Sequence, residues 1–497
     1  MSVKQSLIAS TALIALSFPA SAEITPAEVW TNIQTYYANS GMTLTATNET
    51  DGDDMILRDV VMTSKRDTGD ITVNIPEITL EQNGDGVDVS MSETMTVNIP
   101  TKGLDGATST TLVTVTQKDM TSNITGDAAD MKIDFKAPET IVETSGSKAA
   151  EGDIPTVLRV TLNGMKGTET LKSGDITEVT SDFTFDSLSY TMTSASPPLS
   201  EEPGAAPSTF NSTGSFENTA VSFEMMAPAG STGMKLSESL ANGFSTKGTV
   251  KFGKSTGTSE VETPNGQFLS DSTSESSVLN FSLDASGAQY SATGLGAILD
   301  MTFPGFPMPI HVEMASMGAG VKMPMVASDE AAPIGMDLRM ENLTVNEELW
   351  GLFDPSKKLP RTPATVIMAL DGMAKLTAEI TDPASIAPGA MPFELENLSL
   401  TELKIALLGA DLTGTGAMTV DNTQPVPVPA GAVDLRLEGG NGLIDKLVET
   451  GLVPAEQLMG IRMMLGLFAV PAGDDVMTSK IEMRDDGGVY ANGQRLR

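Results

Sequence analysis

The sequence predicts a mainly β protein of extended, curved antiparallel sheets in a meander, with an N-terminal helix and a C-terminal helical hairpin. Threonine, serine, valine and glycine are abundant, whereas aromatic residues make up only 5% of the chain, and this composition favours strands and turns. Apolar and polar residues alternate in stretches such as 71–75 and 95–99, which is the period of a strand. Tight-turn sequences such as Asn83-Gly84-Asp85-Gly86 separate these stretches and suit hairpins.

Strand signals recur along most of the chain, so we expect a long antiparallel meander. The word Thr-Val-Asn-Ile-Pro occurs at residues 72–76 and again at 96–100, a spacing that suits a strand, a turn and a second strand. The other expected strands are residues 111–116, 131–135, 156–162, 183–192, 220–226, 248–252, 278–283, 364–370, 394–400, 403–408, 480–484 and 489–491.

The N-terminal helix is predicted from a capping box. Thr25 and Glu28 have the spacing at which each side chain bonds the backbone N–H of the other residue, and Pro26 suits the first helical position. Val29 and Trp30 then begin an apolar stripe at helical spacing, and Gly41 stands where the helix should end.

Two helices are expected near the C-terminus, after a short one at residues 347–353. Asn441 can cap the first helix, which stops at Gly451, and Pro454 begins the second. Because a short connection joins two apolar stripes, we expect the hairpin to pack as a cover on the C-terminal sheet. The stripe residues are Leu443, Ile444, Leu447, Val448, Leu458, Ile461, Leu465 and Phe468.

The chain is long enough for several structural units. Prolines at 197, 198, 203 and 207 predict a loop, because proline cannot donate to a strand ladder. The expected parts are a signal peptide (1–22), an N-terminal helix plus β-meander (23–194), a Pro/Ser-rich loop (195–214), a middle β region (215–335) and a C-terminal β domain with the helical hairpin (336–497).

The first residues have the pattern of a secretory signal. Lys4 precedes an apolar run at residues 7–18, and small residues lead to an expected cleavage between Ala22 and Glu23. The run is too short to span a bilayer, and no other stretch has enough consecutive apolar residues for a membrane helix. We therefore expect a periplasmic protein with no transmembrane segment.

The charge excludes some partners. A formal net charge of −35 gives a surface that repels nucleic acid, which needs a basic footprint. Cysteine is absent, so disulfides cannot stabilise the fold.

Several matches to catalytic motifs lack the necessary context. Residues 248–255 fit the phosphate-loop pattern and residues 253–257 the nucleophile elbow, but both patterns need a strand followed by a helix. The stretch alternates like a strand. His311 is the only histidine, and it lies in an expected strand, so no catalytic triad is predicted and no catalytic residue is assigned.

Calcium binding is a weak candidate, because calcium takes oxygen ligands alone and two acidic loops could supply several. Hairpin turns favour the same residue types for backbone reasons and are the preferred interpretation. The candidate ligands are Asp51, Asp53, Asp54, Asn83, Asp85 and Asp88.

The 30 methionines allow a copper(I) interpretation, since thioethers are soft ligands, with Met314 and Met317 or Met323 and Met325 as pairs. Methionine is more often an adaptable filler of cores and apolar grooves. We expect the second role and no cofactor.

The stretches 349–355 and 359–364 read Leu-Trp-Gly-Leu-Phe-Asp-Pro and Leu-Pro-Arg-Thr-Pro-Ala. Together with residues 442–447 and 451–456, they resemble an alphaproteobacterial exported family, domain of unknown function 2125. The resemblance is firmest over residues 340–497. It implies an exported, β-rich protein and brings no catalytic residues.

The expected function is non-enzymatic: a periplasmic protein whose sheet binds an apolar ligand or lipid in envelope maintenance. Amphipathic strands and methionines that could line a groove motivate this expectation. The alternative is a structural or protein-interaction module that contacts envelope proteins through sheet edges. A hydrolase or a calcium-binding surface protein comes third.

Overall fold

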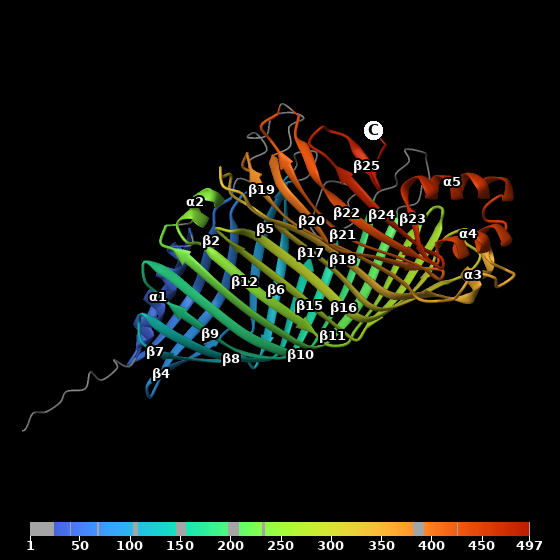
Figure 1. The fold of residues 1–497 in the computed structure, drawn as a ribbon. Helices are drawn as coiled ribbons and strands as arrows, with labels where there is room; N and C mark the ends of the chain where they lie inside the picture. The colour runs from blue at the N-terminus through green and yellow to red at the C-terminus, as the bar shows by residue number, and fades with distance from the viewer. Residues whose placement is uncertain are drawn as a thin grey trace, which may run out of the picture.

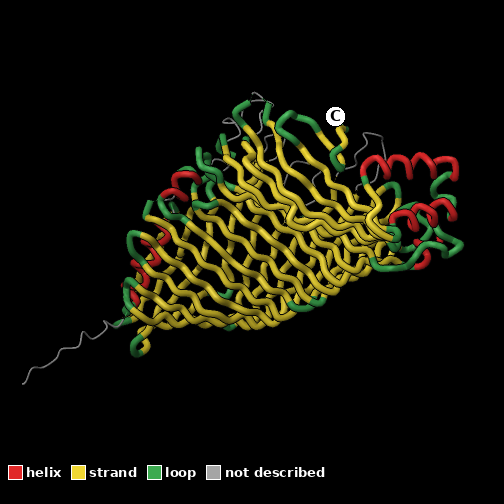
Figure 2. Tube along the Cα trace, viewed as in Figure 1, coloured by secondary structure: helices red, strands yellow, loops and turns green. Residues whose placement is uncertain are grey.

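The computed structural model describes residues 24–39, 41–66, 69–102, 108–145, 156–196, 208–230, 234–380, 392–424 and 426–496. Over these residues the strands form one 26-stranded sheet. Figure 1 shows a single long, rolled sheet with α1 at one end and α3, α4 and α5 at the other, and Figure 2 shows that strands dominate the molecule. The predicted mainly β meander with terminal helices is confirmed. The expected cleavage site at Ala22 and Glu23 lies outside the described residues.

The helices are α1 (Pro26–Asn39), α2 (Leu236–Ala241), α3 (Glu347–Phe353), α4 (Gly440–Glu449) and α5 (Leu458–Phe468), the last preceded by a 3-10 turn at Ala455–Gln457. The strands are β1 (Met42–Asp51), β2 (Asp54–Ser64), β3 (Ile71–Asn83), β4 (Gly86–Met91), β5 (Thr94–Lys102), β6 (Thr108–Lys118), β7 (Thr121–Gly126), β8 (Asp130–Ser145), β9 (Val157–Lys172), β10 (Ile176–Ser196), β11 (Ser208–Pro228), β12 (Ser245–Phe252), β13 (Ser255–Thr263), β14 (Gly266–Ser274), β15 (Ser276–Asp284), β16 (Gly287–Thr302), β17 (Ile310–Met323), β18 (Ala332–Val345), β19 (Ala364–Leu376), β20 (Phe393–Leu407), β21 (Ala410–Asp421), β22 (Val428–Glu438), β23 (Val470–Gly473), β24 (Val476–Met483), β25 (Val489–Ala491) and β26 (Gln494–Arg495).

The sheet follows the order of the chain with antiparallel pairing throughout the described strands. β4 and β5 run end to end along β3, and β6 and β7 run end to end along β8. The same arrangement places β12 and β13 along β11, and β14 and β15 along β16. The two Thr-Val-Asn-Ile-Pro copies lie in β3 and β5, which pair directly, with Val73 opposite Val97.

The alternation of faces slips by one residue in the middle of the strands. Leu57 and Val60 of β2 are three residues apart and both 1% exposed, although regular alternation would place them on opposite faces. Ala137 and Thr140 of β8 are buried with the same spacing. The pairs on either side of these slips remain in register in β2–β3 and β8–β9, because both partner strands slip together.

We call the row of slips the face-shift line. Six of its positions have positive φ, a conformation that favours Gly, Asn and Asp. Because an extra residue bends a strand and increases its twist, a row of them bends the whole sheet. The six residues are Asp59, Asp119, Gly164, Asn218, Gly296 and Asn342.

Replacing Gly164 with alanine should destabilise the protein more than replacing Gly52. Both glycines have φ near +67°, at +66° and +68°, so each substitution carries roughly 1–2 kcal/mol of left-handed strain. Only at Gly164 would the added Cβ also clash with a neighbour, the Asp186 carboxylate, whereas nothing lies within 4 Å at Gly52. Urea denaturation of both variants measures the difference, and equal losses would contradict this account of the line.

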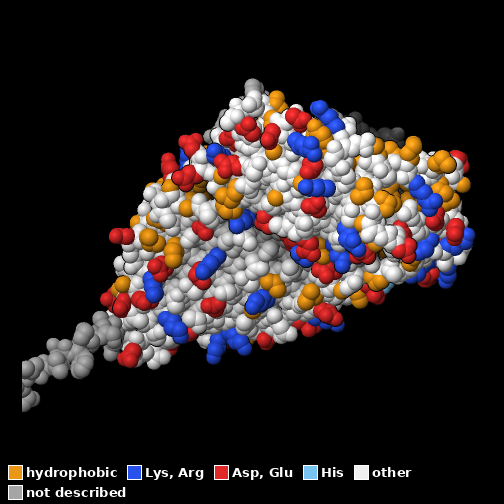
Figure 3. Space-filling model, viewed as in Figure 1, with side chains coloured by type: hydrophobic (Ala, Val, Ile, Leu, Met, Phe, Trp, Pro, Cys, Tyr) orange, Lys and Arg blue, Asp and Glu red, His pale blue; other side chains and the backbone are white. Residues whose placement is uncertain are grey.

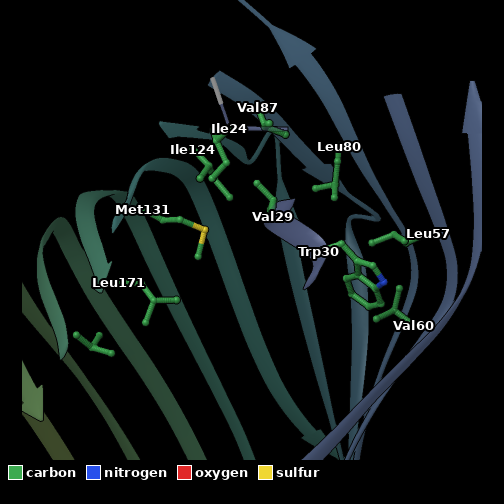
Figure 4. Packing of buried hydrophobic residues seen from close by; sticks show 11 residues of the cluster. Ile24, Val29, Trp30, Leu57, Val60, Leu80, Val87, Ile124, Met131 and Leu171 are labelled. Carbon is green, nitrogen blue, oxygen red and sulfur yellow. The ribbon is translucent and has the colours of Figure 1, made fainter. Parts of the chain in front are cut away.

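A core lies where α1 packs on the sheet. The capping box is present: the backbone N–H of Thr25 donates to Glu28 (2.9 Å) and that of Glu28 donates to the Thr25 hydroxyl (3.3 Å). Trp30 is 5% exposed, and Figure 4 shows it among side chains from strands that curve around the helix. The buried cluster is Ile24, Val29, Trp30, Leu57, Val60, Leu80, Val87, Ile124, Met131, Leu171 and Val179.

The predicted division into parts is not visible as a break in the sheet. β10 runs to Ser196 and β11 begins at Ser208, so the predicted loop at 195–214 is too long at both ends. The serine- and threonine-rich start of β11 reads as a loop in sequence, yet it pairs with β10 and β13. β18 crosses the predicted boundary between residues 335 and 336. Residues 197–207 lie outside the described part.

The C-terminal helical hairpin is present, but two expectations about it are wrong. Gly439, not Asn441, precedes α4, and the Asp475 carboxylate caps it by accepting the backbone N–H groups of Asn441 and Gly442, each at 2.9 Å. The expected packed cover is also absent, since α5 has no buried residue. Its inner stripe, Leu458, Ile461 and Leu465, is only half-buried, and Phe468 is exposed. No helix among the described residues is long and apolar enough to cross a membrane.

Candidate functional site

The two faces of the sheet differ in chemistry. One face carries a row of directly paired polar residues that crosses the strands from β4 to β16. Many of these side chains bond each other, as where Asn123 donates to Asp88 (2.7 Å) and Ser222 donates to Asp182 (2.6 Å). The row consists of Asp88, Asn123, Asp134, Thr168, Asp182, Ser222, Thr249, Asn280 and Ser291.

The opposite face is apolar and continues from the α1 core. Val89 packs against that core, and pairing carries its row across the sheet as far as β22. Between β11 and β22 the row holds no polar side chain, and neither does the row beside it, apart from the Tyr290 hydroxyl. The first row is Val221, Val250, Leu279, Ala292, Ala319, Leu338, Met368, Leu403, Gly414 and Leu435. The second is Phe223, Gly248, Phe281, Tyr290, Val321, Met336, Leu370, Leu400, Gly416 and Val433.

The helix α1 covers this face at the N-terminal end of the sheet, and no element covers it at β17 and β18 in the described part of the chain. Under α1, Leu80 and Val87 are at most 2% exposed, whereas Val321 and Met336 in β17 and β18 are 40% and 44% exposed. Scattered exposed apolar residues are normal, but contiguous ones mark an interaction surface. We call the stretch from β11 to β22 the uncovered apolar face.

Small residues shape the uncovered apolar face. Ala292 and Ala319 are paired neighbours in β16 and β17. The larger Tyr290–Val321 pair lies to one side of them, and Met317 lies to the other. The side chains at these two positions are therefore shorter than those around them. Because the backbone N–H and C=O groups are already used in the ladders, the face offers contacts to carbon and, apart from the Tyr290 hydroxyl, no hydrogen bonds.

The calcium candidates lie at two hairpin turns. Asp51 pairs with Asp54 across the β1–β2 turn that contains Asp53, and the Asp54 carboxylate accepts the backbone N–H of Gln82 (2.8 Å). In the β3–β4 hairpin, where Asp85 is in the turn, the two carboxylate oxygens of Asp88 accept amide hydrogens from Asn83 (2.6 Å) and Asn123 (2.7 Å). In the described ranges no group of three or more His, Cys, Asp or Glu residues is placed to hold a metal ion.

His311 lies on the polar face of β17. Its Nδ1 is 2.7 Å from Asp300 and its Nε2 is 3.1 Å from Glu313. The hydrogen bond to Asp300, followed by that to Glu313, raises the pKa of His311. Both ring nitrogens are engaged by carboxylates, so neither is free to take a proton from a nucleophile. Ser255 of the elbow pattern lies in β13, 2.8 Å from the Ser274 hydroxyl.

The methionine pairs proposed for copper belong to β17 or follow it. Met317 is opposite Gly294 and Met340 in the ladders and is 44% exposed on the uncovered apolar face. Met314 lies beyond the face-shift line in the same strand and pairs with Ala297. The apolar-groove interpretation of these methionines fits this position.

The stretch that carries the family resemblance folds as a closed corner between β18 and β19. Asp354, which ends α3, is 0% exposed, and it accepts Arg361 (2.6 Å) and the backbone N–H groups of Lys358 (3.0 Å) and Leu359 (2.8 Å). The Arg361 guanidinium lies 4.3 Å from the centre of the Trp350 ring. Burial alone would raise the pKa of Asp354, but these hydrogen bonds outweigh it and hold the pKa at about 2. These contacts occupy the Asp354 carboxylate and hold the corner together.

The chain matches no protein-family model, no curated protein and no solved structure. The uncovered apolar face is therefore the strongest functional candidate that its own residues provide. Sequence reasoning predicted an apolar binding surface on the sheet but did not place it on particular strands, because the order in which the strands pair is set by tertiary structure.

Proposed function

We propose that this is an exported, non-enzymatic protein that holds an apolar ligand, such as a lipid acyl chain, on the uncovered apolar face and serves in maintenance of the cell envelope. The observation that carries the proposal is the pair of apolar rows from β11 to β22. Nine strand spacings at ~4.8 Å make them roughly 40 Å long. The signal-like residues 7–22 support export.

An aliphatic chain suits this face better than a peptide. A bound peptide brings N–H and C=O groups that need partners, and leaving such groups unpaired is costly. The two rows supply none between β11 and β22, apart from the hydroxyl of Tyr290. A hydrocarbon chain needs only apolar contact, which both rows supply.

Placing charge on the uncovered apolar face should weaken this binding strongly. We expect the purified protein to bind a fluorescent fatty acid saturably, and the Val321→Glu, Met336→Glu double variant to bind it at least about tenfold more weakly, because a carboxylate strongly disfavours contact with hydrocarbon. Both side chains are exposed, so the melting temperature should change little. Fluorescence titration measures the affinity.

Gln289→Glu is the matched control, since Gln289 neighbours Tyr290 in β16 but is on the polar face, paired with Lys322. It should bind like the parent protein. Native mass spectrometry of protein purified without detergent should show co-purified lipid. No saturable binding together with no lipid would overturn the proposal.

A further inference from the structure

The helix α5 exposes apolar side chains at one end of the molecule. Met459, Met463 and Leu467 follow each other at four-residue spacing on its outer side and are 81%, 73% and 42% exposed, and Met464 lies beside them. The half-buried stripe of Leu458, Ile461 and Leu465 occupies the other side. The helix is therefore apolar nearly all round, which is usual only in a protein core or in a membrane.

This helix is held in place despite its exposure. At its C-terminal end the carbonyl of Phe468 accepts the Ser479 hydroxyl (2.5 Å) and the Asn492 amide (2.9 Å). Arg462, its one charged residue, is paired with Asp445 of α4 (2.7 Å). Lys358, in the corner that follows α3, donates to the last turn of α4 through the carbonyl of Glu449 (3.0 Å). The exposed stripe thus belongs to a fixed surface, which we call the helical tip (residues 347–361 and 440–468).

The charge of the helical tip differs from that of the rest of the chain. Its 44 residues hold six acidic and five basic side chains, a net charge of −1, against −35 for the whole protein. Figure 3 shows hydrophobic side chains gathered over the α5 end, with both basic and acidic side chains around them. Zwitterionic lipid headgroups can approach such a surface without the repulsion that the acidic remainder would exert on anionic ones.

We propose that the helical tip docks on a lipid bilayer of zwitterionic headgroups, with Met459, Met463 and Leu467 entering the boundary between headgroups and acyl chains. A bilayer fits better than a protein partner, because the outer stripe carries no charged or hydrogen-bonding group to set a register and its methionines adapt to a fluid surface. The tip also begins at the end of β22, the last strand of the uncovered apolar face, since α4 follows β22 directly. Its use in passing lipid to that face rests on the proposed function, but the docking does not.

Flotation with vesicles of phosphatidylcholine and phosphatidylethanolamine tests the docking. We expect the full protein to float with the vesicles and the Met459→Glu, Met463→Glu variant to lose at least about tenfold in partitioning, because two side chains that enter the boundary would become charged. Val426→Glu is the matched control: Val426 is 74% exposed, in the connection between β21 and β22, and its variant should float like the parent. The variants should keep the parent melting temperature.

Failure of parent flotation, or equal flotation of the double variant, would overturn the docking. A dimer in the parent that the double variant loses, without flotation, would assign the stripe to a second copy of the chain and overturn it as well. Fatty-acid titration of the same variant without vesicles separates the two proposals, because it should still bind the probe at the uncovered apolar face.

Discussion

Replacing Trp30 with alanine should lower the free energy of unfolding by about 3–5 kcal/mol, the usual cost of truncating a buried tryptophan. Trp30 joins α1 to strands that are far apart in the chain, since Leu57 of β2 and Leu171 of β9 belong to the same cluster. Removing its ring leaves a cavity at the centre of the core where α1 packs on the sheet. Urea denaturation followed by circular dichroism measures the change.

Leu465→Ala in α5 is the companion variant. Because Leu465 is only half-buried, its truncation should cost about 1 kcal/mol, on the order of half the burial free energy of a leucine. If Leu465→Ala proved as costly as Trp30→Ala, the division into a sealed end and an open end would be wrong.

Asp354→Asn should lower stability at neutral pH, and the deficit should shrink in acid. The buried carboxylate has a pKa of about 2 in the folded protein, below its ordinary value of about 3.9. A lowered folded pKa means that the carboxylate stabilises the fold above about pH 4 and that this contribution disappears as the pH falls towards 2. Urea midpoints of the parent and variant at pH 7 and pH 3 should therefore differ more at pH 7.

Glu347→Gln is the control for this ion pair. Glu347 also bonds Arg361, at 3.0 Å, but its side chain is 52% exposed, and exposed pairs contribute little. Its variant should have nearly the parent midpoint at both pH values. A parent-like midpoint for Asp354→Asn at pH 7 would show that the corner does not depend on the carboxylate.

Local signals predicted the ends of the fold better than its middle. The capping box at Thr25 and Glu28 specifies α1 by short-range hydrogen bonds, and it is present as expected. Asn441 has equally good capping chemistry, yet Asp475, 34 residues further on, caps α4 instead. Such a partner is fixed by tertiary structure and leaves no local trace.

The middle of the sheet shows why the sequence pattern predicts two short strands where the structure has one long strand. Residues 394–400 and 403–408 were predicted as two strands, but the continuous strand β20 covers nearly all of both, with a register irregularity between Leu400 and Leu403. The alternation of apolar and polar residues in its two halves is out of phase. A search for a two-residue period therefore places the end of a strand where the strand only slips by one residue. The candidate site could not be assembled from sequence for a different reason, since its two rows appear only when the pairing of the strands is known.

The prediction that α5 packs as a buried cover was wrong for a different reason. An apolar stripe on a helix predicts that the stripe is buried, but it does not identify what buries it. The predicted stripe of Leu458, Ile461 and Leu465 is the half-buried side of the helix, but Met459 and Met463 on the other side are also apolar and remain exposed. The sequence alone did not show that this second apolar side is left uncovered.

The face-shift line restricts how such a sheet can change in length during evolution. A hairpin added beside Asn218 or Gly296 would have to interrupt its own alternation at matching height, either by a one-residue slip in both strands or by a break between two shorter strands, as between β12 and β13 along β11. An uninterrupted strand at that place would turn half of its side chains to the wrong face. Duplication of existing hairpins satisfies this condition automatically, whereas recruitment of an unrelated hairpin does not. The sheet is therefore suited to lengthening by hairpins that already contain the interruption at the matching height.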